Sequence, residues 1–320
     1  MLKTILTLVL LAFAACTAAQ TSAWPDKPVT LVVPYPAGAG VDPVARLVGK
    51  HLSELWGQPV VVSNKAGGSG SIGAAFVARS NPDGLTVMMS ATAEVVINQF
   101  IMANMQYDPD KDLRPVTLAV RLPFVLLANP KQPYATAAEL VAFARRNPDT
   151  VTYASSGQGT PQHLAAVLFE QLAGVRMTHV PYKGVAPSLT ALIAGEVDIG
   201  FAGLPAGLPH VRAGNVRALG LSSPGESPAA PEIPPLGRTP GLAGFDLTQW
   251  FGIFVPAATP EPIVKKLQLD VAKVLSIPEV RKALEDQGAV PSGMPTAEFE
   301  AFVRSEREKF GRIAKGLPIQ

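Results

Sequence analysis

Two glycine-rich segments carry the residue types and spacing expected of a site for a small anion. They are Val33-Pro-Tyr-Pro-Ala-Gly-Ala-Gly-Val-Asp42 and Ser155-Ser-Gly-Gln-Gly-Thr-Pro-Gln-His163. Each follows a β-rich run and precedes a helix-like pattern, and the start of a helix offers backbone N–H groups that have no partner within the helix. Two such helix starts that face each other would hold a carboxylate between them, and this is the chemistry that we expect.

Two polar side chains, Asp42 and His163, fall near the starts of the predicted helices. A carboxylate at a helix start normally caps its own helix, so we predict that Asp42 does so and preorganises the first loop. Arg46, one turn later, could pair with it. His163 could donate a hydrogen bond to a bound carboxylate, or it could be hydrogen-bonded locally within its helix.

Other motifs point to chemistry that we do not favour. The segment Gly68-Ser-Gly-Ser-Ile-Gly73 has the GxGxxG pattern of dinucleotide-binding proteins, but it follows the second predicted strand rather than the first. We interpret it as a turn that brings backbone close to a smaller ligand. The sequence has no GxSxG or HExxH motif and its four histidines are scattered. We therefore expect no metal and no other cofactor, although a distant histidine could still reach a serine.

Composition narrows the class of protein further. A chain of 320 residues that is 48% hydrophobic and 16% charged can form two lobes with real cores. Its net charge is +2 and no run of Lys or Arg exceeds two residues, so nucleic acid is not an expected partner. Residues 1–23 predict an export signal, whose apolar stretch is too short to span a bilayer. The single cysteine, Cys16, either leaves with this signal or carries a lipid anchor.

Strand-like and helix-like patterns alternate along the rest of the chain. Strands at 29–33, 59–63 and 85–89, with helices at 43–55 and 73–78, predict a βαβαβ unit. The order repeats with strands at 151–155, 176–180 and 197–201 and helices at 162–173 and 187–194. A shift of 119 positions matches the glycines at 38 and 40 to those at 157 and 159, so we predict two lobes of similar topology. A strand at 217–221 and a strand at 249–255 that returns to the first lobe complete the prediction.

Several separated motifs together resemble the Bug receptors, which are the periplasmic substrate-binding proteins of tripartite tricarboxylate transporters. Besides the first glycine segment, these motifs are Trp24-Pro-Asp-Lys-Pro-Val-Thr, Asn64-Lys-Ala-Gly-Gly-Ser-Gly-Ser-Ile-Gly73, Pro82-Asp-Gly84, His179-Val-Pro-Tyr-Lys-Gly184, Gly195-Glu-Val-Asp198 and Trp250-Phe-Gly-Ile-Phe-Val-Pro256. The resemblance covers nearly all of the chain after the signal.

The resemblance implies an α/β protein with the two-lobed periplasmic-binding-protein fold (Venus flytrap, type II), in which each lobe is a mixed or parallel sheet flanked by helices. Lobe 1 would comprise residues 24–123 and 250–320, and lobe 2 residues 124–249. The implied function is a periplasmic, monomeric receptor, not an enzyme, that delivers a small carboxylate to membrane transporter subunits. An exported enzyme acting on a small acid or ester, and a receptor that feeds a signalling sensor, stay open as alternatives.

In that family the carboxylate lies between the loop after the first strand and the helix start of the second lobe. The positions of this chain that match are therefore the implied ligand-binding residues: Tyr35, Ala37, Gly38, Gly40, Val41, Asp42, Ser69, Gly70, Ala91, Thr92, Ser155, Gly157, Thr160, His163, Tyr182 and Gly184. The chain departs from the family in having Ala39 between the two glycines and Val41 at the position of a threonine, which removes one hydroxyl from the first loop.

Overall fold

The computed structural model of the 320-residue chain describes residues 24–38 and 40–315. The predicted signal, Cys16 and Ala39 lie outside the described residues. Ten strands form one mixed sheet in the order β2-β1-β3-β9-β4-β7-β5-β6, with β8 and β10 also paired to β4. The strands are β1 (Val29–Val33), β2 (Val60–Asn64), β3 (Thr86–Ala91), β4 (Leu113–Ala128), β5 (Thr152–Ser155), β6 (Thr178–Pro181), β7 (Ile199–Gly203), β8 (Arg217–Leu221), β9 (Thr248–Pro256) and β10 (Val290–Pro291).

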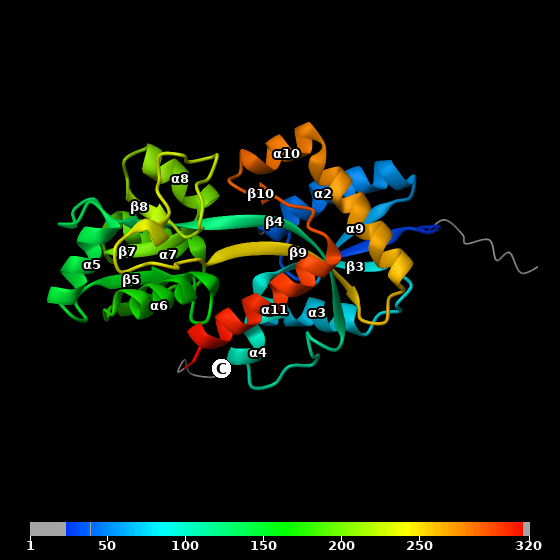
Figure 1. The fold of residues 1–320 in the computed structure, drawn as a ribbon, viewed down its shortest axis with the longest axis horizontal. Coiled ribbons are helices and arrows are strands. Elements are labelled where there is room, and N and C mark those ends of the chain that lie inside the picture. The colour runs from blue at the N-terminus through cyan, green and yellow to red at the C-terminus, as the bar shows by residue number, and fades with distance from the viewer. Residues whose placement is uncertain (1–23, 39, 316–320) are drawn as a thin grey trace, which may run out of the picture.

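Helices cover the sheet along its whole length (Figure 1). They are α2 (Val41–Trp56), α3 (Ser71–Ala78), α4 (Asn98–Ile101), α5 (Ala137–Arg146), α6 (Pro161–Ala173), α7 (Val185–Ala194), α8 (Leu204–Arg212), α9 (Glu261–Ser276), α10 (Pro278–Glu285) and α11 (Thr296–Ile313). Three short turns complete the list: the 3₁₀ turns η2 (Gly68–Gly70) and η4 (Leu236–Arg238), and the π-helical turn η3 (Ala93–Ile97).

Both predicted α/β units are present. In the first, β1 is parallel to β2 and β3, and in the second, β5 is parallel to β6 and β7. The helices that follow β1 and β5 both end at a left-handed glycine, Gly57 after α2 and Gly174 after α6. Glycine is favoured there because it adopts a positive φ without a steric penalty. The two lobes are therefore built on the same sequence of elements.

The strands β4 and β9 connect the two lobes. Residues 113–123 of β4 pair with β9, whereas residues 124–128 pair with β7 and β8. The change occurs between Pro123, opposite Thr248, and Phe124, opposite Gly203. In Figure 1 the two strands cross the middle of the molecule, with the elements of one lobe on each side. The α/β two-lobed fold predicted from the sequence is thus confirmed.

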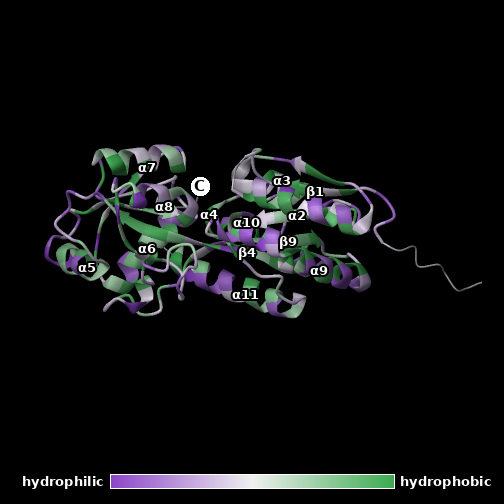
Figure 2. Ribbon diagram, turned by 90° about the horizontal axis from the view of Figure 1, so that it is seen from above, coloured by the Kyte–Doolittle hydropathy of each residue, from purple (hydrophilic) through white to green (hydrophobic). Residues whose placement is uncertain are grey.

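The apolar residues of each strand point alternately to two cores, as the period of a strand requires. Leu31 and Val33 of β1 face a core under α2 and α9, and Val32 faces the core on the other side of the sheet. This explains the almost continuous apolar run at 29–33, because such a strand is buried on both faces. Figure 2 shows both apolar and polar residues along helices such as α9 and α11.

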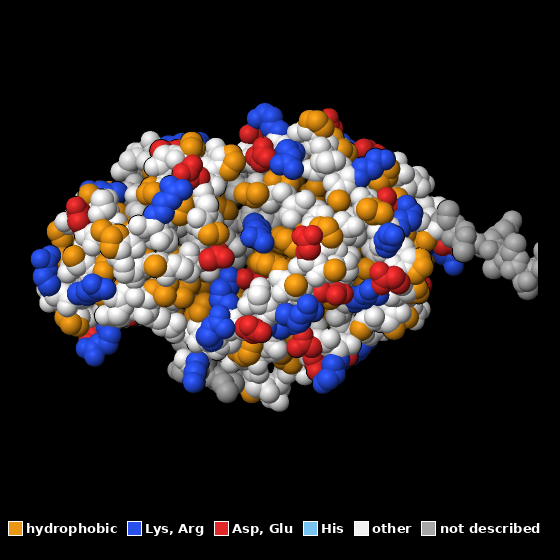
Figure 3. All heavy atoms as spheres, in the orientation of Figure 1, with side chains coloured by type: hydrophobic (Ala, Val, Ile, Leu, Met, Phe, Trp, Pro, Cys, Tyr) orange, Lys and Arg blue, Asp and Glu red, His pale blue; other side chains and the backbone are white. Residues whose placement is uncertain are grey.

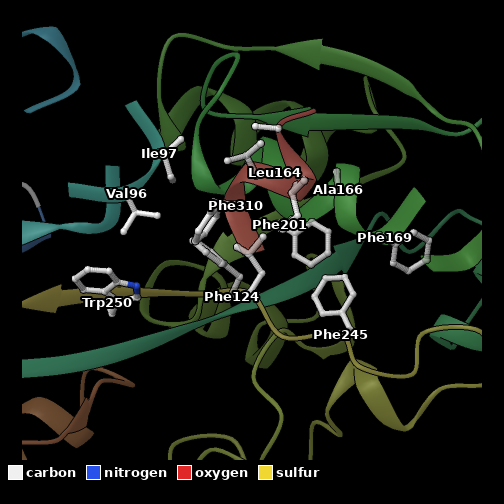
Figure 4. Packing of buried hydrophobic residues seen from close by; sticks show 14 of the residues in the cluster. Val96, Ile97, Phe124, Leu164, Ala166, Phe169, Phe201, Phe245, Trp250 and Phe310 are labelled. Atoms are coloured by element: carbon white, nitrogen blue, oxygen red, sulfur yellow. The ribbon is translucent and has the colours of Figure 1, made fainter. Parts of the chain in front are cut away.

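One core runs from one lobe into the other. Trp250 and Phe310 from the first lobe pack in the same cluster as Phe124, Phe201 and Phe245, as Figure 4 shows. Charged side chains of both signs are interspersed on the face in Figure 3. Among the described residues, no helix is long and apolar enough to cross a membrane.

Candidate ligand-binding cleft

A cleft of about 370 Å³ lies where the two lobes meet. Its walls come from both: the loop after β1, the turns η2 and η3, and α4 on one side, and the loop that opens α6 on the other, with Gln249 of β9 at the junction. A volume of this size suits a small molecule. Hollows of about 390 and 640 Å³ also occur beside α11 and α3, but each is lined by residues of the first lobe alone.

The described residues that line the cleft are both polar and apolar, and none of them is Asp, Glu, Lys, Arg or His. Hydroxyls and amides are supplied by Ser69, Ser156, Gln162 and other residues, whereas Ile101 and Met102 form an apolar stretch. An uncharged wall with one apolar region favours a ligand that combines a polar head with a short apolar body. An anion would here be held by hydrogen bonds and helix dipoles rather than by a lysine or an arginine.

The second glycine loop brings the start of α6 to the cleft. Thr160 is the N-cap, its Oγ1 accepting from the backbone N–H of His163 at 3.4 Å, and Pro161 occupies the first turn. This is the arrangement that the sequence Thr-Pro at a helix start favours. Thr160, Pro161 and Gln162 all line the cleft. The positive end of this helix dipole therefore faces the space available to a ligand.

His163 supports this loop and stays uncharged. The backbone N–H of Gly159 donates to its Nδ1 at 3.0 Å, and its ring stacks on that of His179 with centroids 4.1 Å apart. Only 4% of the side chain is exposed. Burial, with a smaller effect from His179, lowers the pKa of His163 from 6.5 to about 4, so the ring is neutral at pH 7. Of the two roles considered for His163, the local hydrogen bond is the one observed.

Ser155 and His179 form a pair that the sequence did not reveal. Ser155 Oγ lies 2.7 Å from His179 Nε2, and the two residues are 24 positions apart in the chain. A serine bound to a histidine is the start of a nucleophilic site. However, Ser155 is only 1% exposed, and neither residue is among those that line the cleft. We therefore assign the pair to the support of the glycine loop.

The first glycine loop is fixed by an ion pair. Asp42 accepts hydrogen bonds from the backbone N–H of Gly38 at 2.9 Å, from Asn64 Nδ2 at 2.8 Å and from the guanidinium of Arg46 at 2.9 and 3.0 Å. The Arg46 hydrogen bonds lower the pKa of Asp42 from 3.8 to about 2, although burial acts in the opposite direction. The predicted Asp42–Arg46 pair is confirmed.

The predicted capping role of Asp42 needs correction. The N-cap of α2 is Gly40, which makes no side-chain cap bond, and Asp42 is the second residue of the helix. Its carboxylate reaches back beyond the cap to the loop and takes the N–H of Gly38. Asp42 therefore preorganises the loop, as predicted, but by a different contact.

The two glycine loops correspond best at a difference in residue number that the sequence pattern did not suggest. Gly38 and Gly159 both have positive φ, 81° and 73°, and each donates its N–H to the side chain four residues later. This pairs Asp42 with His163, a shift of 121 instead of 119. Counting glycines alone gave the wrong shift because Gly40 has an ordinary helical φ of −48°.

A buried acid lies directly behind the cleft wall. Glu94, in η3, is 0% exposed, and its Oε2 lies 2.8 Å from the hydroxyl of Tyr35, which lines the cleft. Its Oε1 accepts from the backbone N–H of Ala91 at 2.6 Å. Burial raises the pKa of Glu94 from 4.5 to about 8. Sequence reasoning did not single out this residue.

The structure brings four of the implied site residues to the cleft wall, namely Tyr35, Ser69, Ala91 and Thr160. The hydroxyl of Thr92 instead bonds to the backbone of Trp250, and Gly70 lies against Glu94, where an added Cβ would be 2.8 Å from Oε2. The other implied residues lie in or behind the loops and are not among those that line the cleft: Ala37, Gly38, Gly40, Val41, Asp42, Ser155, Gly157, His163, Tyr182 and Gly184.

Sequence reasoning missed eleven residues of the wall. Five belong to the second glycine loop and the start of α6 and could have been included by taking that loop as a whole, but α4 and Gln249 carried no sequence signal. The missed residues are Gly68, Ala93, Asn98, Ile101, Met102, Ser156, Gln158, Gly159, Pro161, Gln162 and Gln249. In the part of the chain that the structure describes, no group of three or more His, Cys, Asp or Glu residues is arranged to hold a metal ion.

Comparison with known proteins places the chain in a family. Residues 44–319 match the tripartite tricarboxylate transporter family receptor, TctC. BugT of Bordetella pertussis is 31% identical over 91% of this chain and 90% of its own length. Rpa4515 of R. palustris, solved with adipate, is 34% identical with a TM-score of 0.79 and covers 91% of this chain and 97% of its own. MatC of Rhodopseudomonas palustris, solved with bound malate, is 32% identical with a TM-score of 0.75 and covers 91% and 100%.

The chain therefore belongs to the TctC family of solute-binding receptors, to which the Bug proteins also belong. Proteins of this family are periplasmic receptors and not enzymes. The two structural neighbours with bound acids show that the same fold holds carboxylates in related proteins.

Proposed function

We propose that this protein captures a small carboxylate in the cleft between its lobes and delivers it to a membrane transporter of the tripartite tricarboxylate type. The observation that carries the proposal is a cleft lined by both lobes, into which the start of α6 faces. Family membership supports the transporter as partner and the periplasm as location.

The character of the wall suggests the class of carboxylate. Hydrogen-bond donors at the start of α6 suit a carboxylate, and Ile101 and Met102 suit a short apolar chain. We therefore propose an aliphatic dicarboxylate, the class to which adipate and malate belong. Several charge-assisted hydrogen bonds, each contributing roughly 1.5 to 3 kcal/mol, would offset the desolvation of the anion.

We further propose that the lobes comprise residues 24–123 with 250–320 and residues 124–249, and that they close on the ligand about β4 and β9. The change of strand partner after Pro123 supports this division. A ligand that contacts both lobes binds the closed form better and so stabilises closure.

Calorimetry with adipate, malate, citrate, acetate and an uncharged control, adipamide, tests the ligand class. We expect micromolar or tighter binding of at least one dicarboxylate, no binding of adipamide, and a smaller radius of gyration by X-ray scattering when the acid is added. Failure of every acid to bind would contradict the proposed function.

The variant Ala93→Trp tests the site. Ala93 lines the cleft and is partly exposed, so an indole ring in its place would occupy much of the available volume. We expect at least about 100-fold weaker binding, which corresponds to about 2.7 kcal/mol. The control Ala142→Trp, at an exposed position of α5, should bind as the wild type does. Unchanged affinity in Ala93→Trp would place the ligand elsewhere.

A further inference from the structure

The contacts of Glu94 connect a buried acid to the ligand cleft. Its carboxyl Oε2 meets the Tyr35 hydroxyl at 2.8 Å, Oε1 accepts from the N–H of Ala91 at 2.6 Å, and the backbone N–H of Glu94 itself also interacts with the carboxyl. Tyr35 and Ala91 both line the cleft. Tyr35 is therefore the only side chain hydrogen-bonded to the carboxyl group of Glu94 among the described residues, and it also lines the cleft.

Two directions of the hydrogen bond between Glu94 and Tyr35 are possible at this separation. When Glu94 is ionised, the tyrosine O–H must donate to the carboxylate and is no longer available to a ligand. When Glu94 is protonated, its own O–H on Oε2 can donate to the tyrosine oxygen, because Oε1 is occupied by Ala91. The tyrosine hydrogen is then free to point into the cleft.

We propose that Glu94 is a positioning residue that makes anion binding depend on a proton: in its neutral form it turns the Tyr35 hydroxyl into a donor for the carboxylate ligand, and in its ionised form it withdraws that donor. The ionised form also places a second negative charge behind the wall. This proposal rests on the proposed function and adds the condition under which the site accepts an anion.

Among the described residues, no cation contacts the carboxyl group of Glu94. Tyr35 contributes from the β1–α2 loop, and Tyr107, whose hydroxyl donates to the Glu94 backbone carbonyl, from the loop before β4. The packed elements α3, α4 and η2 carry no charged residue. Arg307 of α11 donates to the Val95 carbonyl and pairs with Asp110.

The pKa shifts agree with this geometry. The pKa of Glu94, raised by burial to about 8, keeps the acid neutral at pH 7. Burial and the neighbouring Glu94 raise the pKa of Tyr35, so the phenol stays protonated. His163, with a pKa lowered to about 4, and His179, whose pKa is also lowered, do not change charge between pH 7 and 9.5.

The test is the pH dependence of binding, measured by calorimetry with whichever of adipate and malate binds more tightly. Both are fully ionised above pH 7. We expect constant affinity from pH 6.5 to 7.5, then a decrease that approaches tenfold per pH unit above pH 8, or about 30-fold in all between pH 7 and 9.5. Binding at pH 8.5 should take up protons, detected as heat that varies with the buffer.

Two variants separate the proposed role from a structural one. Glu94→Gln keeps the shape and stays neutral, and its amide can still donate to Tyr35, so we expect wild-type affinity at pH 7 that no longer decreases toward pH 9.5. Tyr35→Phe should weaken binding at pH 7 about tenfold because a donor to the anion is lost. The protonation state of Glu94 can also be measured without ligand. At pH 7 the wild type should show an infrared band of a protonated carboxylic acid that is absent from Glu94→Gln.

Each outcome decides between the proposals. Wild-type binding that stays constant to pH 9.5, an unchanged pH profile in Glu94→Gln, or absence of the infrared band would overturn the role of Glu94 and leave the proposed function in place. Failure of all acids to bind at any pH would overturn the proposed function, and this proposal with it.

Discussion

The two glycine loops contain the same kind of hydrogen bond, but its acceptor is charged in the first loop and neutral in the second. In each, a left-handed glycine donates its N–H to the side chain four residues later, Gly38 to Asp42 and Gly159 to His163. Asp42 is ionised and needs a counter-charge, which Arg46 supplies one turn on. His163 is neutral, and the residue at the matching position, Val167, is apolar. The second loop is thus shaped without placing a charge near the ligand.

This difference indicates which of the two helix starts could bind an anion. The negative charge of Asp42 already interacts with the loop before α2, and none of the described residues of that loop, 36–38 and 40–42, lines the cleft. The start of α6 lines the cleft and carries no acid in its first turn. The symmetric clamp of two helix dipoles stays a prediction, whereas the residues that line the cleft favour one helix start opposed by hydroxyls and amides.

The largest expected effect concerns the stability of the second loop in acid. Because folding lowers the pKa of His163 from 6.5 to about 4, its contribution to the free energy of unfolding is complete above pH 6.5 and is lost as the pH falls to 4. The loss amounts to about 3 kcal/mol. Urea unfolding of the wild type and of His163→Gln should show that the wild type declines more steeply over this range. Parallel curves would contradict a neutral buried His163.

A carboxylate at position 163 should give the second loop the same negative charge as the first and so remove the difference in charge between them. In His163→Asp, a carboxylate behind the cleft wall would oppose the binding of an anion by about 2.7 kcal/mol, or roughly 100-fold. His163→Asn removes the ring equally but adds no charge, and should bind within about threefold of the wild type, a change of less than 1 kcal/mol. Calorimetry at pH 7 measures both. Equal affinities would show that charge at this position does not reach the ligand.

Removing the charge of the first loop should affect stability more than binding. Asp42→Asn weakens the hydrogen bonds to Gly38, Asn64 and Arg46, and we expect about 2 kcal/mol less stability at pH 7. Since folding lowers the pKa of Asp42, this contribution is present above pH 3.8 and is lost as the pH falls through about 2. Urea titrations at pH 7 and pH 3 compare the two conditions.

The exposed pair of Lys282 and Asp286 provides the control for that variant. It has the same spacing of four residues, but both side chains are largely exposed. Asp286→Asn should therefore cost less than about 1 kcal/mol. If Asp286→Asn lost as much stability as Asp42→Asn, the hydrogen bonds of Asp42 to Gly38 and Asn64 would add no stability beyond that of an exposed ion pair on a helix.

The smallest effect is expected at the cap of α6. Thr160→Ala removes the side-chain acceptor for the His163 N–H and the donor to the Gly157 carbonyl, which should cost about 1 kcal/mol. Because Thr160 also lines the cleft, affinity should fall as well, by roughly tenfold. Chemical unfolding and calorimetry on one preparation give both values. A loss of stability with full affinity would restrict Thr160 to capping.

Much of the fold could be predicted because it follows from local patterns. The apolar runs, the glycine turns and the helical spacing placed the strands and helices of both α/β units within two or three residues of their observed bounds. The long strand β4 was not predicted, because Pro115 and Pro123 interrupt its pattern. These prolines are tolerated since one lies beside a bulge and the other at the change of strand partner.

The site could be predicted only in part. Tyr35, Ser69, Ala91 and Thr160 were reachable from motifs, because each stands at the end of a strand or the start of a helix. Glu94 was not, because a single glutamate in an apolar segment gives no indication of what buries it. Its raised pKa depends on the position of Tyr35, 59 residues earlier, and on its complete burial.

The sequence by itself determined the two α/β units, the family and the local hydrogen bonds within the two glycine loops. These features depend on residues within a few positions of each other. Only the tertiary structure decided which loop lines the cleft, which acid lies behind its wall and that Ser155 meets His179. Those outcomes depend on desolvation and on the packing of segments far apart in the chain, which no local pattern encodes.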